Sequence, residues 1–95
     1  MTPDDLDAEI REHYVYFRVL PDGRLCGVAR LMFHWTMHVD IDAVGYADRY
    51  CYETLDGAIT ALDAWSGKGD PEGWHRHLKS GRRRNLKTGE EWVAP

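Results

Sequence analysis

The sequence predicts an α+β fold, in which an antiparallel sheet of about four strands carries a C-terminal amphipathic helix on one face. Residues 14–20 are rich in aromatic and β-branched residues, and over residues 25–41 hydrophobic and polar residues alternate, which is typical of strands with one buried face. Turn residues interrupt this region, and the spacing of hydrophobic residues becomes helical after residue 54. A chain of 95 residues has room for one domain, with one core layer between a sheet and a helix or two.

A short helix is expected first, at residues 3–12. Thr2 can cap it, and Pro3 has no amide hydrogen to leave unsatisfied in the first turn. Three acidic residues would lie near the positive end of its dipole: Asp4, Asp5 and Asp7. Because its hydrophobic side is limited to Leu6 and Ile10, this helix would form only a thin lid.

A β-hairpin should follow, with one strand at residues 14–20, a turn at Pro21-Asp22-Gly23 and a second strand from residue 24. Every odd position from 25 to 41 is hydrophobic or Gly. A single strand of that length would measure about 55 Å, whereas a globule of this size has a radius of gyration of about 12 Å. We therefore expect a tight connection near residues 29–32 and two strands, at 24–30 and 33–41, whose odd positions face the core throughout.

A second turn at residues 42–45 and a returning strand at 46–52 would complete the sheet. Either Tyr46, Asp48, Tyr50 and Tyr52 or Ala47, Arg49 and Cys51 face inward, and the pattern leaves both arrangements open. Thr54 is a good N-cap for the final helix, which should end at Ser66-Gly67. Its hydrophobic stripe consists of Leu55, Ala58, Ile59, Leu62 and Trp65.

Charge divides the chain into a compact domain at residues 1–66 and an extended basic tail at residues 67–95. The first part has five basic and twelve acidic side chains, a balance of −7, and the second has seven basic and four acidic ones, a balance of +3. The tail begins with a loop rich in Gly and Pro and repeats Leu-Lys-Ser/Thr-Gly eight residues apart, which predicts a small hairpin or two consecutive turns. It is either packed on the domain or free of it.

The sequence offers little for catalysis, so we expect neither an enzyme nor a cofactor. It contains no nucleotide-binding or hydrolase motif, and Cys26 and Cys51 occupy strand positions that suit small buried thiols. His34 and His38 would be about 13 Å apart on one strand, too far to share a metal ion. We interpret them as solvent-facing polar residues on an open sheet face, and we also expect no metal at His75 and His77.

Three groups of residues are candidates for contact with a partner. An acidic surface would comprise Asp4, Asp5, Asp7, Glu9, Glu12, Asp40, Asp42 and Asp48. An aromatic surface, against which a partner or a second copy of the chain could pack, would comprise Tyr46, Tyr50, Tyr52, Trp74 and Trp92. A basic surface for phosphate contact would comprise Lys79, Arg82, Arg83, Arg84 and Lys87. The alternatives for that basic run are a solvated tail, or one folded back on the acidic domain.

The segment GYADRYCYETLDGAITALDAWSGKGDPEGWHRH, with GRRR and the ending EEWVAP, resembles small proteins encoded by bacteriophages and prophages of proteobacteria. The resemblance covers roughly residues 25–95, and it transfers no functional residue. Small phage proteins of this kind include inhibitors of host defence such as anti-CRISPR proteins.

From the charge division and this resemblance we expect a phage-encoded, non-enzymatic binding protein. It would inhibit a host defence complex, a host protein or ribonucleoprotein, by occupying its nucleic-acid-binding surface. The alternative is a small nucleic-acid-binding accessory protein that uses the basic aromatic tail. The acidic N-terminus lacks the hydrophobic stretch of a signal peptide, and no membrane-spanning run occurs, so the expected location is the host cytoplasm.

Overall fold

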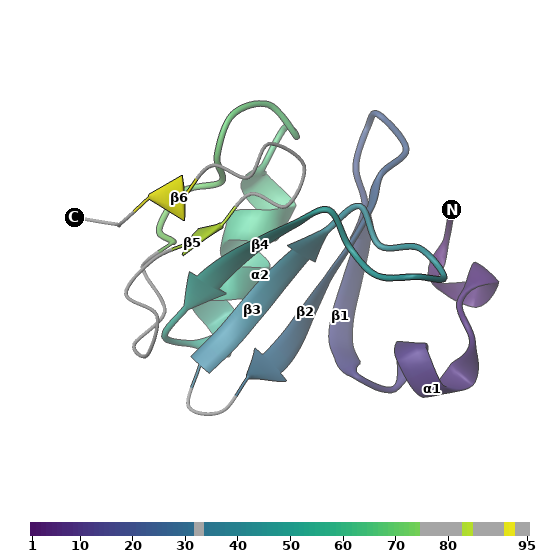
Figure 1. The fold of residues 1–95 in the computed structure, drawn as a ribbon. Coiled ribbons are helices and arrows are strands. Elements are labelled where there is room, and N and C mark those ends of the chain that lie inside the picture. Colours follow the sequence, from purple (N-terminus) through teal and green to yellow (C-terminus); the bar gives the residue numbers. More distant parts are fainter. Residues whose placement is uncertain (32–33, 75–82, 85–90, 93–95) are drawn as a thin grey trace.

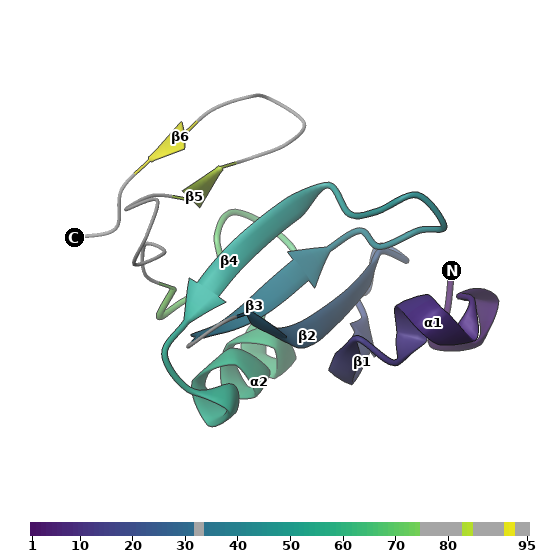
Figure 2. The same cartoon turned by 60° about the horizontal axis from the view of Figure 1, so that its bottom comes forward.

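The computed structural model describes residues 1–31, 34–74, 83–84 and 91–92 of the chain. Within these ranges the predicted α+β architecture is confirmed: a four-stranded antiparallel sheet of order β1-β2-β3-β4 packs against one long helix (Figure 1). The strands are β1 (Tyr14–Val19), β2 (Leu25–Leu31), β3 (His34–Val39) and β4 (Asp48–Tyr52). The helix α2 spans Leu55–Ala64 and lies along one face of the sheet (Figure 2).

The N-terminal helix is shorter than predicted and is divided in two. A 3₁₀ turn at Pro3–Asp5 precedes α1 (Ala8–Arg11), a single helical turn. The carboxylate of Asp5 accepts the backbone N–H of Thr2 at 2.7 Å, which closes the first turn. Between the two turns Leu6 adopts an extended conformation and is buried, so the need to bury Leu6 accounts for the interruption.

The turns fall where the sequence places them. Gly23, at a φ of 93°, lets the chain reverse between β1 and β2, where the backbone N–H of Leu20 donates to Arg24. Between β3 and β4, one carboxylate oxygen of Asp42 accepts the amide hydrogens of Val44 and Gly45 at 2.8 and 3.0 Å. These contacts make a compact turn at the end of the sheet.

The prediction that odd positions 25–41 all face one core is wrong. Leu31 of β2 pairs with His34 of β3, so only two residues connect these strands. Paired residues lie on the same face of a sheet, and this pairing therefore matches odd positions of β2 with even positions of β3. The hydrophobic alternation continues in sequence, but it changes faces at the connection.

The main core consequently lies between α2 and one face of the sheet. The sheet contributes Cys26, Val28, Met37, Val39, Tyr50 and Tyr52, and the helix contributes Ala58, Leu62 and Trp65. A second, smaller cluster of Leu6, Leu25 and Ile41 lies on the opposite face, with Ile10, Tyr14, Phe17 and Tyr46 around it. Asp40 makes this division possible: its left-handed φ of 62° turns the chain so that Val39 and Ile41 enter different clusters.

The helix α2 begins where its sequence indicates but ends before the predicted Ser66-Gly67, because Trp65 is already extended. The side chain of Thr54 accepts the backbone N–H of Gly57 at 3.0 Å, and the chain leaves the helix at Trp65. Arg18 of β1 donates from Nη1 to the carbonyl oxygens of Leu62 and Trp65, so a cation lies at the negative end of the helix dipole. This contact fastens the end of the helix to the edge strand.

The tail contains one short pair of strands within its described residues. β5 (Arg83–Arg84) pairs antiparallel with β6 (Glu91–Trp92), with Arg83 opposite Trp92. The segment just after α2 packs on the main core, because Trp74 contacts that cluster and Asp70 accepts the hydroxyl of Tyr50 at 2.7 Å.

Candidate functional site

The predicted acidic residues divide between two segments that meet at one end of the molecule. The N-terminal segment and the turn between β3 and β4 lie close together (Figure 1), because Leu6 and Ile41 share the smaller cluster with Leu25. Exposed carboxylates surround this contact: Asp4, Asp5, Asp7, Glu9, Glu12 and Asp42. We call these six residues the acidic end.

Two of the predicted acidic residues do not join this group. Asp40 is half-buried at the strained turn position described above. Asp48 begins β4 opposite Val39, on the helix side of the sheet, and its carboxylate accepts the backbone N–H of Arg49 at 2.8 Å. Asp48 therefore lies away from the N-terminal carboxylates, whereas Asp40 lines a hollow beside the turn that carries Asp42.

Nearby arginines neutralise little of this charge. Arg11 has a long, exposed contact of 3.7 Å with Asp4, of a kind that contributes little energy in water. Arg24 is held by Asp22 at 2.8 Å and also donates to the carbonyl oxygen of Gly67. Asp7, Glu9 and Glu12 thus remain a negative, solvated surface.

The turn that belongs to the acidic end presents one exposed hydrophobic side chain. Val44 lies at its tip and is 95% exposed. A shallow hollow beside it is lined by Asp40, Asp42, Gly45, Tyr46 and Ala47. The carboxylate of Asp42 accepts the amide hydrogens of Val44 and Gly45, so hydrogen bonds close the turn and Val44 projects into water at its tip.

The aromatic surface is corrected by the structure. Tyr50 and Tyr52 face α2 and are each only 2% exposed, so they belong to the core and are not available to a partner in this fold. The hydroxyl of Tyr52 donates to the carbonyl oxygen of Glu72, which holds the segment after α2 against the sheet. Trp74 is half-buried against the same core, and the side chain of Trp92 lies outside the described part of the structure.

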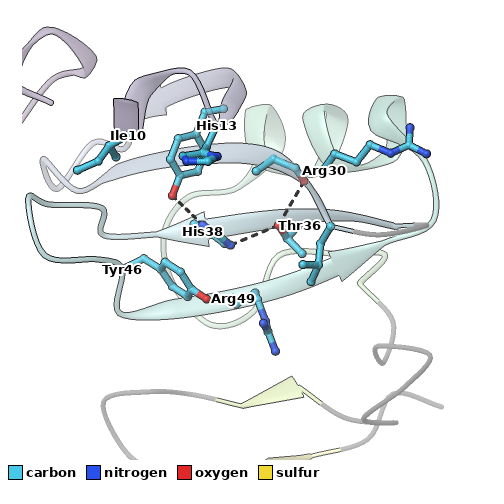
Figure 3. A pocket seen from close by; sticks show the side chains of 10 residues that line it. Ile10, His13, Arg30, Thr36, His38, Tyr46 and Arg49 are labelled. Carbon is cyan, nitrogen blue, oxygen red and sulfur yellow. Dashed lines mark hydrogen bonds between the residues drawn. The ribbon is translucent and has the colours of Figure 1, made fainter. Parts of the chain in front are cut away.

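Tyr46 does lie on the other face, but it stacks on His38 instead of standing free. The two rings are 3.7 Å apart between centroids and inclined by 19° (Figure 3). On the other side of His38, the hydroxyl oxygen of Tyr14 lies 2.7 Å from Nδ1, and the rings meet edge to face. This group of Tyr14, His38 and Tyr46 was not predicted, since it depends on strand pairing that alternation alone does not reveal.

The polar face of β3 is therefore packed, and our interpretation of it as solvent-facing is wrong. His34 is 6% exposed and Thr36 is 1% exposed, and the hydroxyl of Thr36 donates to the carbonyl oxygen of Ala29 at 3.2 Å. Nε2 of His38 lies 3.3 Å from the same hydroxyl oxygen. Burial, together with the charge of Arg49 opposite, lowers the pKa of His38 to about 4.

The basic candidates cannot be assembled into a site. Arg83 and Arg84 form β5, whereas Lys79, Arg82 and Lys87 lie outside the described residues, as do His75 and His77. No group of three His, Cys, Asp or Glu residues within the described ranges could hold a metal ion. Both cysteines are buried, and burial raises the pKa of the Cys26 thiol to about 11, which disfavours the reactive thiolate.

Two further findings come from the helices and from comparison with other proteins. No helix in the described part of the chain is both long and hydrophobic enough to cross a bilayer. Comparison of the chain with models of protein families, with curated proteins and with solved structures finds no match.

Proposed function

We propose that this protein is a non-enzymatic binding protein whose acidic end occupies a basic, nucleic-acid-binding surface of a partner macromolecule. The observation that carries the proposal is the gathering of six exposed carboxylates, from two segments far apart in the sequence, around the buried cluster of Leu6, Leu25 and Ile41. Such a surface offers a nucleic-acid-binding channel the negative charge that it normally receives from phosphates.

The turn between β3 and β4 supports this function in a second way. Charge brings two proteins together quickly, but affinity usually depends on a few side chains buried at the interface. Val44 is the fully exposed hydrophobic side chain at the acidic end, and contact with a partner would remove it from water. The acidic residues would then guide approach, and Val44 would anchor the complex.

The resemblance to small phage proteins suggests the concrete form: an inhibitor of a host defence complex, such as a CRISPR effector, acting in the bacterial cytoplasm. The target would be a protein or ribonucleoprotein. The inhibitor would compete with the nucleic acid bound there, so binding by the two should be mutually exclusive.

The test is a pull-down from a proteobacterial host lysate, with and without nuclease, followed by competition on the identified target. We expect a nucleic-acid-binding protein whose capture survives nuclease and whose binding to DNA or RNA falls as this protein is added. The variant D7N/E9Q/E12Q should bind at least tenfold more weakly. The control E53Q/D56N/E72Q removes the same charge from exposed positions elsewhere and should bind as the unmodified protein does.

Recovery of nucleic acid alone would overturn this proposal and favour the basic tail as the binding element. Equal weakening by the two variants would also contradict it, because the effect would then follow net charge and not the acidic end.

A further inference from the structure

A hollow of about 270 Å³ opens on the sheet face opposite α2, beside the rings of Tyr14, His38 and Tyr46 (Figure 3). Ile10, Ala29 and Leu31 give it hydrophobic walls, and Arg49 lies at its margin on β4, with its guanidinium extending away from the ring of His38 (Figure 3). The hollow is separate from the acidic end, although α1 and the turn between β3 and β4 each contribute a residue to it. Its volume is near the lower limit for small-molecule sites, which suits a ligand no larger than a mononucleotide.

The charge of this hollow is opposite to that of the protein as a whole. The chain carries a net charge of −4, yet no described residue that lines the hollow is acidic. Arg49 pairs with His38 across β3 and β4, so the two side chains share this face. A cation beside a cavity without carboxylates attracts an anion.

Arg49 also differs from the other arginines of residues 1–74 in what its side chain does. Arg11 lies 3.7 Å from Asp4, Arg18 caps α2, Arg24 is held by Asp22, and Arg30 lies over the ring of Trp35, 5.4 Å from its centroid. Within the described residues no carboxylate lies within ion-pair distance of the half-buried Arg49 guanidinium. Its five donor hydrogens are suited to a carboxylate or phosphate.

The aromatic residues supply a flat surface beside that cation. The stacked rings of Tyr46 and His38 hold each other in place, and Tyr14 and Thr36 engage both nitrogens of His38. A planar ligand could lie along such a preorganised group with little loss of side-chain freedom on binding. At neutral pH His38 is uncharged, so the positive charges of the lining are those of Arg30 and Arg49.

We propose that this hollow binds a small planar anion, a single aromatic ring or nucleobase that carries a carboxylate or a phosphate. The ring would lie against Tyr46 and the hydrophobic wall of Ile10 and Leu31, and the anionic group would meet Arg49. This role is independent of the acidic end, because none of the six carboxylates is needed for it.

The test uses two probes that share this chemistry, uridine 5′-monophosphate and benzoate, in titrations followed by amide NMR spectra. We expect at least one probe to shift the signals of Ile10, Tyr46 and Arg49 with saturation at millimolar concentration. The neutral counterparts, uridine and benzyl alcohol, should bind at least tenfold more weakly. The probe that binds more tightly identifies the anion as a nucleotide or an aromatic acid.

Arg49→Gln should weaken binding at least tenfold. The affinity of Arg49→Lys should lie between those of Arg49→Gln and the unmodified protein, because lysine keeps the charge but loses the bidentate geometry. Lys68→Gln, which removes the same charge from an exposed site outside the hollow, should leave affinity unchanged. Three results would overturn the proposal: no saturable shift with either probe, equal binding of the neutral counterparts, or equal weakening by the Lys68 variant.

Discussion

The hydroxyl oxygen of Tyr14 lies 2.7 Å from Nδ1 of His38, a contact that joins β1 to β3 across the strand between them. The hydrogen-bond partners of His38 determine which of its ring nitrogens carries the proton. The hydroxyl hydrogen of Thr36 is donated to Ala29, so Thr36 can only accept from His38, and Nε2 must carry the hydrogen. Nδ1 therefore accepts from Tyr14, and the ring is neutral in the folded protein.

This arrangement predicts that the protein loses stability in mild acid. The pKa of His38 is about 4 in the folded state, against an ordinary value of about 6.5 for an unfolded chain. As the pH falls from 6.5 to 4, His38 takes up a proton in the unfolded state but stays neutral in the folded state. The free energy of unfolding should therefore drop by up to roughly 3 kcal/mol between pH 6.5 and pH 4. Denaturant titrations across this range measure the drop.

His38→Gln isolates this effect, since carboxylates also titrate at the acidic end of the window. Its stability should change less with pH than that of the unmodified protein. His13→Gln, at an exposed position, should keep the full dependence. An NMR titration that placed the pKa of His38 near 6.5 in the folded protein would contradict the prediction.

A second prediction concerns the arginine that holds the end of α2. Arg18→Met keeps much of the packing but removes the donor to the carbonyl oxygens of Leu62 and Trp65. Loss of a charge-assisted hydrogen bond to a helix end should lower the free energy of unfolding by about 1.5–3 kcal/mol. Arg30→Met, on the neighbouring strand, should cost less than about 1 kcal/mol, because it lies over Trp35 at an exposed site. Equal losses in the two variants would refute this role for Arg18.

The third prediction concerns Gly27, against which the side chains of Tyr14 and Ile41 pack closely. A Cβ atom at this position of β2 would meet Cδ1 of the Tyr14 ring at 2.6 Å and Cδ1 of Ile41 at 3.1 Å. Gly27→Ala should therefore lower the free energy of unfolding by about 1–3 kcal/mol, because a ring atom cannot move aside cheaply. In the Tyr14→Leu background the same change should cost less, and a double-mutant cycle on thermal unfolding measures the difference. Strictly additive losses would show that the ring is not the obstacle.

The fourth prediction tests the start of α2. Thr54→Ala removes the acceptor for the backbone N–H of Gly57 and should cost about 1 kcal/mol. Thr60→Ala, at an exposed position inside the same helix, should be neutral or slightly stabilising, because Ala has the higher helix propensity. Circular dichroism during thermal unfolding distinguishes the two, and a cost at Thr60 as large as that at Thr54 would argue against the cap.

The sequence predicted the fold correctly at turns and at the helix N-cap, where a residue type such as Gly, Asp or Thr has a well-defined structural role. Gly23 and Asp42 predicted their turns, and Thr54 predicted the N-cap of α2. The need for a connection between β2 and β3 followed from chain length alone. These features depend on a few neighbouring residues, so one sequence suffices to identify them.

Which face each strand buries could not be predicted in the same way. A connection of two residues between β2 and β3 differs little in sequence from one of three. The two-residue connection seen here pairs Leu31 with His34 on one face, whereas a three-residue connection would place them on opposite faces. The burial of Tyr50 and the stacking of Tyr46 on His38 both follow from that register. The acidic end was recognised as charge, but its gathering in space depends on the cluster that Leu6 and Ile41 form with Leu25.

Because the buried hydrophobic residues form two clusters of unequal size, different parts of the molecule differ in local stability. Ten buried residues hold α2 to the sheet, whereas three hold the N-terminal segment to the other face. Segments with few buried contacts open locally at a lower free energy than the whole domain unfolds. The amides of residues 3–12 should thus exchange with deuterium long before those of β2 and β3, through excursions in which the first helical turns detach while the sheet remains intact. In such an excursion the carboxylates that flank Leu6 would move as a tethered arm, able to adapt to the contours of a surface they meet.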